Sequence, residues 1–206
     1  MAEERKNTKI HLGINPKILA GLGTDKQVHT PSYISQERAE QLKKEIRERK
    51  DLLCLIEGAW TPRTGTAMQE YVKKLSSMFN LAGIAVSWEA PYFLVPFIQE
   101  ASKNRGRIYL GGFSLGDDMA EKISRNCRCS VEKLFLLDGT HVVRRIPSNV
   151  KKAVYIGSED SHDYVSIKTE NSSTLIRRIK LFGAGHLDVP EQAFPYVAEE
   201  LAEQYT

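Results

Sequence analysis

The chain has 206 residues, of which 41% are hydrophobic and 27% charged, and its formal net charge is +3. These values are close to the averages for soluble globular proteins and exclude disordered, collagen-like and disulfide-scaffold sequences. The charge excess is too small, and too mixed with acidic residues, to predict a nucleic-acid partner.

Hydropathy and cysteine content indicate the compartment. The longest apolar stretches, such as residues 51–57, are far shorter than the ~20 residues that cross a bilayer, and the first residues, Met-Ala-Glu-Glu-Arg-Lys, contain no hydrophobic secretory segment. The three cysteines, Cys54, Cys127 and Cys129, lack the Cys-x-x-Cys spacing of a zinc site. We expect a cytoplasmic protein with no membrane contact, no metal and no cofactor.

The N-terminal quarter of the chain differs from the rest. Proline, glycine and threonine interrupt residues 1–34, which predicts an irregular arm. Ser35 then precedes a strongly charged stretch and is a suitable N-cap, which predicts an exposed helix over 35–49. We therefore divide the chain into an arm with its helix, 1–49, and a core, 50–206.

From Asp51 onward, short runs rich in Leu, Ile, Val and Tyr alternate with longer segments of helical periodicity. This alternation is typical of βαβ units and predicts a three-layer α/β/α fold with a mainly parallel sheet. The predicted strands are 51–57, 83–88, 106–112, 132–137, 151–157 and 174–182, and the predicted helices are 65–80, 91–104, 115–126 and 189–204.

The third strand is followed by Gly112-Phe-Ser114-Leu-Gly116, which has the Gly-x-Ser-x-Gly pattern of a nucleophile elbow. The turn from strand to helix is so sharp there that the residues flanking the serine must be small, and the serine hydroxyl projects at the helix N-terminus. The pattern predicts a nucleophilic role for Ser114.

A base and an acid follow at later strand ends. A serine hydroxyl needs a base to take its proton, and the base needs an acid to fix its tautomer. His186 follows the sixth strand in Gly-Ala-Gly-His, and Asp160 follows the fifth. We favour Asp160 as the acid, with Asp138 after the fourth strand and Asp163 as alternatives.

With these residues in the order nucleophile, acid, base, residues 50–204 resemble the α/β-hydrolase superfamily, and a small, lidless serine esterase or thioesterase in particular. The resemblance implies a Ser114-His186-Asp160 triad that hydrolyses a small acyl ester or thioester. It also implies an oxyanion hole formed by the backbone N–H groups of Leu115 and of Ala59 or Trp60. Trp88, Tyr92 and Phe93 follow the second strand and are weaker candidates for an acyl pocket.

Three residues depart from the family pattern. Asp117 and Asp118 follow the elbow where a small residue is usual, and Glu57 replaces the usual His before the glycine of the oxyanion loop. These departures leave open an alternative function, a catalytically inactive binding or scaffold protein that keeps the fold. A nucleotide-binding domain is more distant, because Gly111-Gly-Phe-Ser-Leu-Gly116 lacks the dinucleotide spacing Gly-x-Gly-x-x-Gly.

Overall fold

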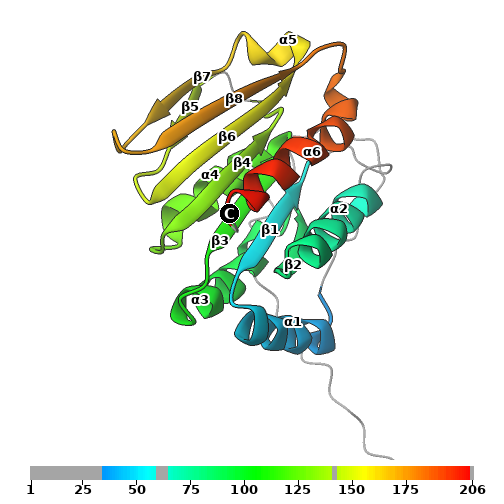
Figure 1. Ribbon diagram of the computed structural model, residues 1–206, viewed down its shortest axis with the longest axis vertical. Helices are drawn as coiled ribbons and strands as arrows, with labels where there is room; N and C mark the ends of the chain where they lie inside the picture. The colour runs from blue at the N-terminus through cyan, green and yellow to red at the C-terminus, as the bar shows by residue number, and fades with distance from the viewer. Residues whose placement is uncertain (1–33, 59–64, 141–142, 205–206) are drawn as a thin grey trace, which may run out of the picture. The chain divides into compact units, whose positions relative to one another are not determined.

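Parallel strands form the centre of the computed structural model, which describes residues 34–58, 65–140 and 143–204 (Figure 1). The larger sheet of this described part has six strands in the order β2-β1-β3-β4-β6-β8, and every neighbouring pair is parallel. The strands are β1 (Leu52–Glu57), β2 (Ala82–Ser87), β3 (Ile108–Phe113), β4 (Val131–Leu137), β6 (Val150–Ser158) and β8 (Leu175–Leu181).

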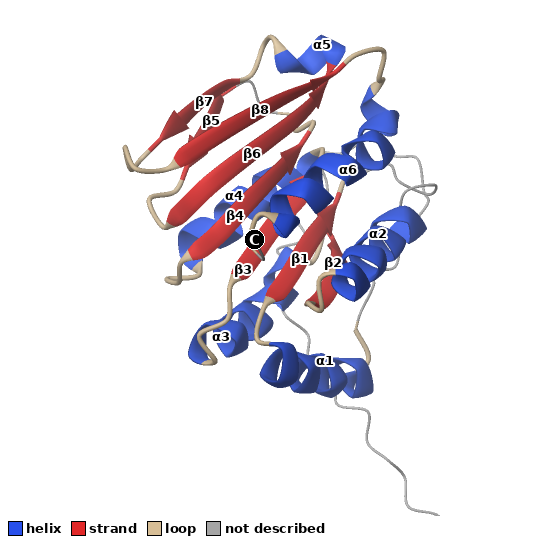
Figure 2. Ribbon diagram, in the orientation of Figure 1, coloured by secondary structure: helices blue, strands red, loops and turns tan. Residues whose placement is uncertain are grey.

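Helices cover both faces of this sheet, because the central strands are apolar on both sides (Figure 2). In β1, Leu52, Cys54 and Ile56 belong to one buried cluster, and Leu53 and Leu55 belong to the other. The first cluster includes residues of α1 (Gln36–Arg49), α3 (Val95–Lys103) and α4 (Leu115–Asn126), and the second includes residues of α2 (Gly65–Met78) and α6 (Val189–Ala202). The predicted three-layer α/β/α fold is confirmed.

The parallel arrangement determines where a site can lie. All six strands of the larger sheet end at the same edge, and ligands of open α/β sheets bind beyond the carboxyl ends of the strands. Ser114 directly follows β3, Asp138 directly follows β4, and His186 follows β8 after a short turn. The topology therefore brings these side chains to one edge.

The first helix corrects one prediction. Ser35 does cap it, since the Ser35 hydroxyl accepts a hydrogen bond from the backbone N–H of Arg38 at 3.1 Å. The helix is not merely exposed, however, because Leu42 and Ile46 are completely buried among residues of β1, α3 and α4. Two apolar residues one turn apart in a very charged helix are enough to attach one face of it to the core.

The sequence analysis did not predict four short elements. They are two strands that pair with each other, β5 (Val143–Ile146) and β7 (Ser166–Thr169), and two helical turns, α5 (Glu159–His162) and η3 (His186–Asp188). A further 3-10 turn, η2 (Pro91–Leu94), opens the segment that was predicted as one helix over 91–104. Elements of three or four residues are too short to show a hydrophobic period.

Candidate active site

The elbow at the end of β3 has the geometry that its sequence predicts. Ser114 has φ 56° and ψ −120°, a backbone conformation that costs of order 1–3 kcal/mol for a non-glycine residue. A Cβ on Gly112 would lie 2.2 Å from the Gly116 carbonyl carbon, and a Cβ on Gly116 would lie 2.1 Å from the Ile56 carbonyl oxygen. The turn can therefore close only with glycine at both positions.

His186 lies against this serine. Its Nε2 is 3.0 Å from the Ser114 hydroxyl oxygen, and its ring stacks on Phe113 with centroids 4.8 Å apart. The loop before it is held in place because the Gly183 N–H donates to the Glu159 carboxylate at 3.3 Å. Ser114 is 6% exposed, whereas the His186 side chain is 45% exposed, so the histidine is the more accessible of the two.

Asp138 is the acid that contacts the histidine. Its Oδ2 lies 2.6 Å from His186 Nδ1. Its Oδ1 accepts hydrogen bonds from the Ser158 backbone N–H at 2.8 Å, from the Ser158 hydroxyl at 3.0 Å and from the Ser161 hydroxyl. Burial alone would raise the pKa of Asp138, but the hydrogen bonds from His186, Ser161 and Ser158 outweigh it and lower that pKa below its ordinary value.

The ionised state of Asp138 fixes the histidine tautomer. A carboxylate can only accept, so His186 must carry its hydrogen on Nδ1 and donate it to Asp138. In the neutral ring this tautomer leaves Nε2 as the acceptor that faces the Ser114 hydroxyl. A hydroxyl beside an unprotonated ring nitrogen, with a carboxylate behind the ring, is the arrangement that activates a serine.

The structure brings Asp138, one of the two predicted alternatives, against His186 in place of the favoured Asp160. Asp160 lies in the first turn of α5, where it is exposed, and Asp163 is 62% exposed and forms an ion pair with Lys180 at 2.8 Å. The short helix α5 turns both carboxylates toward solvent and presents Ser161 to Asp138 instead. The sequence analysis missed the role of Ser158 and Ser161, since isolated serines carry no signal in a single sequence.

The two aspartates that follow the elbow are buried rather than caps of an exposed helix. Asp117 accepts a hydrogen bond from the Leu137 N–H at 2.8 Å, and its Oδ2 lies 3.5 Å from a guanidinium nitrogen of Arg144. Asp118 forms an ion pair with the same guanidinium, and Arg144 is only 1% exposed. Burial raises the pKa of Asp117 well above its ordinary value, although Arg144 opposes this shift. The pair binds α4 to β4 and β5.

One of the predicted oxyanion-hole donors, the backbone N–H of Leu115, lies at the start of α4. Leu115 is the first residue of α4, where backbone N–H groups have no acceptor within the helix and the helix dipole favours negative charge. Ala59 and Trp60, the other predicted donors, lie outside the described residues. Gly58, just before them, lies against the nucleophile: a Cβ placed on it would be 2.7 Å from Ser114 Cβ.

Glu57 precedes this glycine and is the third departure from the family pattern. It is 8% exposed, and its Oε1 is buried without a hydrogen-bond partner among the residues that the structure describes. Burial raises the pKa of Glu57 to about 7. The residue at the position of the usual histidine is therefore a buried acid that keeps its proton in weakly acidic solution.

The aromatic residues after β2 differ in exposure. Trp88 packs partly buried against the core, Phe93 is half-buried, and Tyr92 is 56% exposed. Their part in an acyl pocket stays a prediction.

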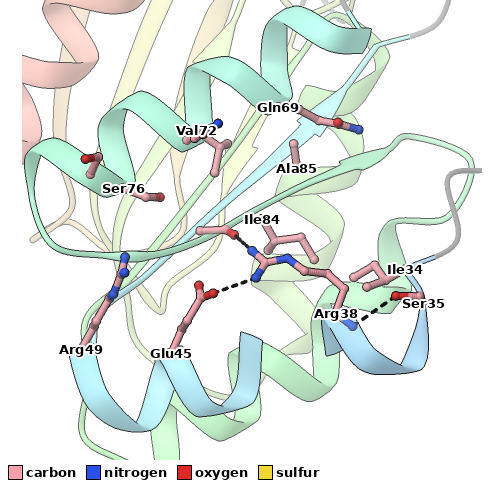
Figure 3. Close-up of a pocket in the computed structure, with 13 residues that line it drawn as sticks. Ile34, Ser35, Arg38, Glu45, Arg49, Gln69, Val72, Ser76, Ile84 and Ala85 are labelled. Carbon is pink, nitrogen blue, oxygen red and sulfur yellow. Dashed lines mark hydrogen bonds and ion pairs between the residues drawn. The ribbon is translucent and has the colours of Figure 1, made fainter. Parts of the chain in front are cut away.

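A cavity of about 580 Å³ lies elsewhere, between α1, α2 and β2 (Figure 3). Arg38 crosses it to reach Glu45 at 2.7 Å and the Gly83 carbonyl oxygen at 3.4 Å. These contacts bind the first helix to the outer strand of the sheet, and neither Ser114 nor His186 lines the cavity.

The described ranges also bear on metals and membranes. Within them, no group of three or more His, Cys, Asp or Glu side chains converges as metal ligands would. No helix in the same ranges is long and apolar enough to cross a membrane.

Comparisons with known proteins add a likeness of fold. No protein-family model matches the sequence, and a search of curated proteins finds no significant relative. Among solved structures, the chain is similar to a protein from Xanthomonas campestris pv. campestris that is assigned to the hydrolases of the alpha/beta superfamily. The likeness covers 75% of this chain and 98% of that one, at 12% identity and a TM-score of 0.48. A likeness at this level of identity concerns the fold alone.

Proposed function

We propose that the chain is a serine hydrolase that cleaves an ester or thioester through an acyl-enzyme on Ser114. The observation that carries the proposal is one continuous chain of hydrogen bonds. It joins the Ser114 hydroxyl to His186 Nε2 at 3.0 Å and His186 Nδ1 to Asp138 at 2.6 Å. Each distance is short enough for direct proton transfer or for orientation of the ring.

The reaction follows from these contacts. His186 takes the hydroxyl proton as Ser114 attacks the acyl carbonyl carbon, and Asp138 stabilises the imidazolium that forms. The carbonyl oxygen becomes an oxyanion beside the N-terminus of α4, where the Leu115 N–H is the proposed donor. His186 then protonates the leaving alcohol or thiol, and water releases the acid from the acyl-enzyme by the same steps.

Asp117 and Asp118 do not oppose this chemistry. Both are buried in contact with Arg144, whose guanidinium supplies one positive charge beside them, and burial favours the uncharged form of Asp117. The alternative of an inactive binding protein rested in part on these two residues, and their pairing with Arg144 removes that part of its support.

Burst kinetics with an activated ester test the proposal. Mixed with excess p-nitrophenyl acetate, the protein should release nitrophenol in a rapid phase of about one equivalent, because acylation of Ser114 precedes slower hydrolysis. Ser114→Ala should show neither the burst nor turnover. A folded wild-type protein that hydrolyses the ester no faster than Ser114→Ala would overturn the proposal. If the burst is observed, the rate of hydrolysis of a thioester with the same acyl group shows which of the two substrate classes the enzyme prefers.

A further inference from the structure

The other end of α4 carries two cysteines that the proposed reaction does not use. Cys127 is the C-cap of the helix, and its backbone N–H donates to the Ile123 carbonyl oxygen at 2.9 Å. Arg128 follows with φ 49°, in the left-handed region, and reverses the chain before β4. This turn brings Cys129 back over Cys127, so that the two free thiols lie with their sulfur atoms 2.8 Å apart.

One amide holds this turn. Asn149 Nδ2 lies 2.7 Å from the Ser124 carbonyl oxygen, 2.7 Å from the Cys129 carbonyl oxygen and 3.6 Å from Cys127 Sγ. The contacts attach the Ser124 and Cys129 carbonyl groups and the Cys127 sulfur to the residue that precedes β6. The two sulfur atoms therefore lie close together because the hydrogen-bonded turn holds both cysteines in place, and not only because of the rotamer of one side chain.

The two thiols differ in access. Cys127 is 7% exposed, whereas Cys129 is partly exposed and lines a surface depression of about 700 Å³. Arg128 and Lys151 also line this depression, and Arg128 is exposed. A small anionic reagent that enters there meets the Arg128 guanidinium, the Lys151 ammonium that is paired with Glu132 at 2.7 Å, and the sulfur of Cys129.

The contact between the thiols also activates the pair. The Cys129 thiol donates a hydrogen bond to the Cys127 sulfur, and this bond lowers the pKa of Cys127 to about 7, although burial opposes the shift. The pKa of Cys129 is raised by the same bond. Near neutral pH the pair therefore readily carries one thiolate and one shared proton, and a thiolate is the reactive form.

We propose that Cys127 and Cys129 form a redox-active dithiol that low-molecular-weight disulfides oxidise to a Cys127–Cys129 disulfide. The sulfur atoms need to approach by only ~0.8 Å to reach the bonding distance of about 2.05 Å. The site is separate from the proposed triad, since Ser114 lies at the N-terminus of α4 and the cysteines lie at and beyond its C-terminus.

The reaction balances as two exchange steps. Because only Cys129 is accessible, the shared proton must first move to Cys127, against the order of the two pKa values. The Cys129 thiolate then attacks one sulfur of the reagent, which breaks the reagent's disulfide and releases its first half as a thiolate that takes the proton of Cys127. The Cys127 thiolate then attacks the Cys129 sulfur of the mixed disulfide, which releases the second half, also as a thiolate. Starting from one thiolate and one thiol, the pair loses two electrons and one proton to the reagent, and solvent supplies the second proton of the two released thiols.

Glutathione disulfide and mass spectrometry test the inference on the full chain. The protein is incubated with the disulfide in its native state and is then denatured and alkylated. The number of thiols that can be alkylated should fall from three to one. The peptide that contains both cysteines should lose about 2 Da, the mass of two hydrogens. The completely buried Cys54 should remain reduced and react only after denaturation.

Two serine variants separate the roles of the thiols. Cys127→Ser lacks the resolving thiol and should accumulate a stable glutathione adduct on Cys129, whereas Cys129→Ser should react far more slowly, because Cys127 is buried. Wild-type protein that keeps three free thiols, or that accumulates the same stable adduct as Cys127→Ser, would contradict the inference.

Discussion

Asp138 fixes the candidate active site through both of its carboxylate oxygens. One oxygen contacts His186, and the other accepts hydrogen bonds from Ser158 and Ser161. The ring of His186 is thus oriented by a carboxylate that is itself held in place from the opposite side. This double attachment makes the acid the most informative residue to change.

Asp138→Asn should slow the reaction of Ser114 with a fluorophosphonate probe by about 10³- to 10⁴-fold, because an amide can donate to Nδ1 and so favour the wrong histidine tautomer. The rate constant of labelling measures this directly. Asp160→Asn is the matched control, since it changes an exposed carboxylate in α5. If Asp160→Asn loses labelling and Asp138→Asn keeps it, the acid has been assigned to the wrong residue.

Glu57 should make the stability of the protein depend on pH. Burial raises its pKa from the ordinary 4.5 to about 7, so between these pH values the unfolded chain ionises while the folded protein stays protonated. The free energy of unfolding should therefore fall as pH rises from about 4.5 to 7, by up to about 3 kcal/mol from this residue.

Chemical denaturation of wild-type protein and Glu57→Gln across this pH range isolates the contribution. The variant carries no titrating group at this position, so the difference in unfolding free energy between the two proteins should change through the range and level off at either side. A difference that stays constant from pH 4 to 8 would show that Glu57 ionises as freely in the folded protein as in the unfolded one.

At the scale of elements, the short strand β5 connects to the elbow helix through one buried cation. Arg144 of β5 forms ion pairs with Asp117 and Asp118 in the first turn of α4. The first turn of α4 also contains the backbone that would bind the oxyanion. An element that the sequence did not reveal therefore supplies a buried positive charge beside the nucleophile.

Arg144→Met should lower the free energy of unfolding by about 3–5 kcal/mol, because it leaves buried carboxylates without their cation. Urea denaturation measures the loss. Lys151→Met removes the cation of an exposed pair with Glu132 and should cost less than about 1 kcal/mol. Equal effects of the two substitutions would show that the buried Arg144 contacts contribute no more to the free energy of unfolding than an exposed ion pair does.

The long elements were predictable and the short ones were not. The central strands are buried on both faces and the helices have a clear apolar face, so alternating apolar runs identified all six strands of the larger sheet. β5 contains two arginines among four residues and resembles a loop in sequence. Its place depends on the buried aspartates of α4, which lie far from it along the chain.

At the scale of the whole molecule, α1 is part of the same core as the sheet. Leu42 and Ile46 are completely buried, and the Arg49 side chain donates to the Leu81 carbonyl oxygen at 2.8 Å. A sequence that is mostly charged conceals this attachment, since two apolar residues on one face are a weak signal of burial. The core therefore begins before residue 50.

Leu42→Ala should destabilise the protein by about 2–5 kcal/mol in one cooperative unfolding transition, because it opens a cavity in the core. Lys44→Ala on the exposed side of the same helix should change stability by less than about 0.5 kcal/mol. An unchanged unfolding midpoint in Leu42→Ala would place α1 outside the cooperative unit.

The candidate site was predictable to the extent that it follows strand ends. The glycines around Ser114 and the position of His186 after the last strand carry a local signal, and the fold brings both residues together. The acid has no such local signal in the sequence, because Asp138 and Asp160 both follow strands whose ends lie at the same edge of the sheet. Only the direction in which α5 turns its side chains distinguishes them.

Covalent labelling followed by peptide mass spectrometry tests whether Ser114 is an activated nucleophile, and it does so without a choice of substrate. Incubated with a fluorophosphonate, the wild-type protein should gain a single adduct on Ser114. Both Ser114→Ala and His186→Ala should remain unlabelled at that peptide while still folded. A folded wild-type protein that gains no adduct, or one that is modified only at another residue, would contradict the account.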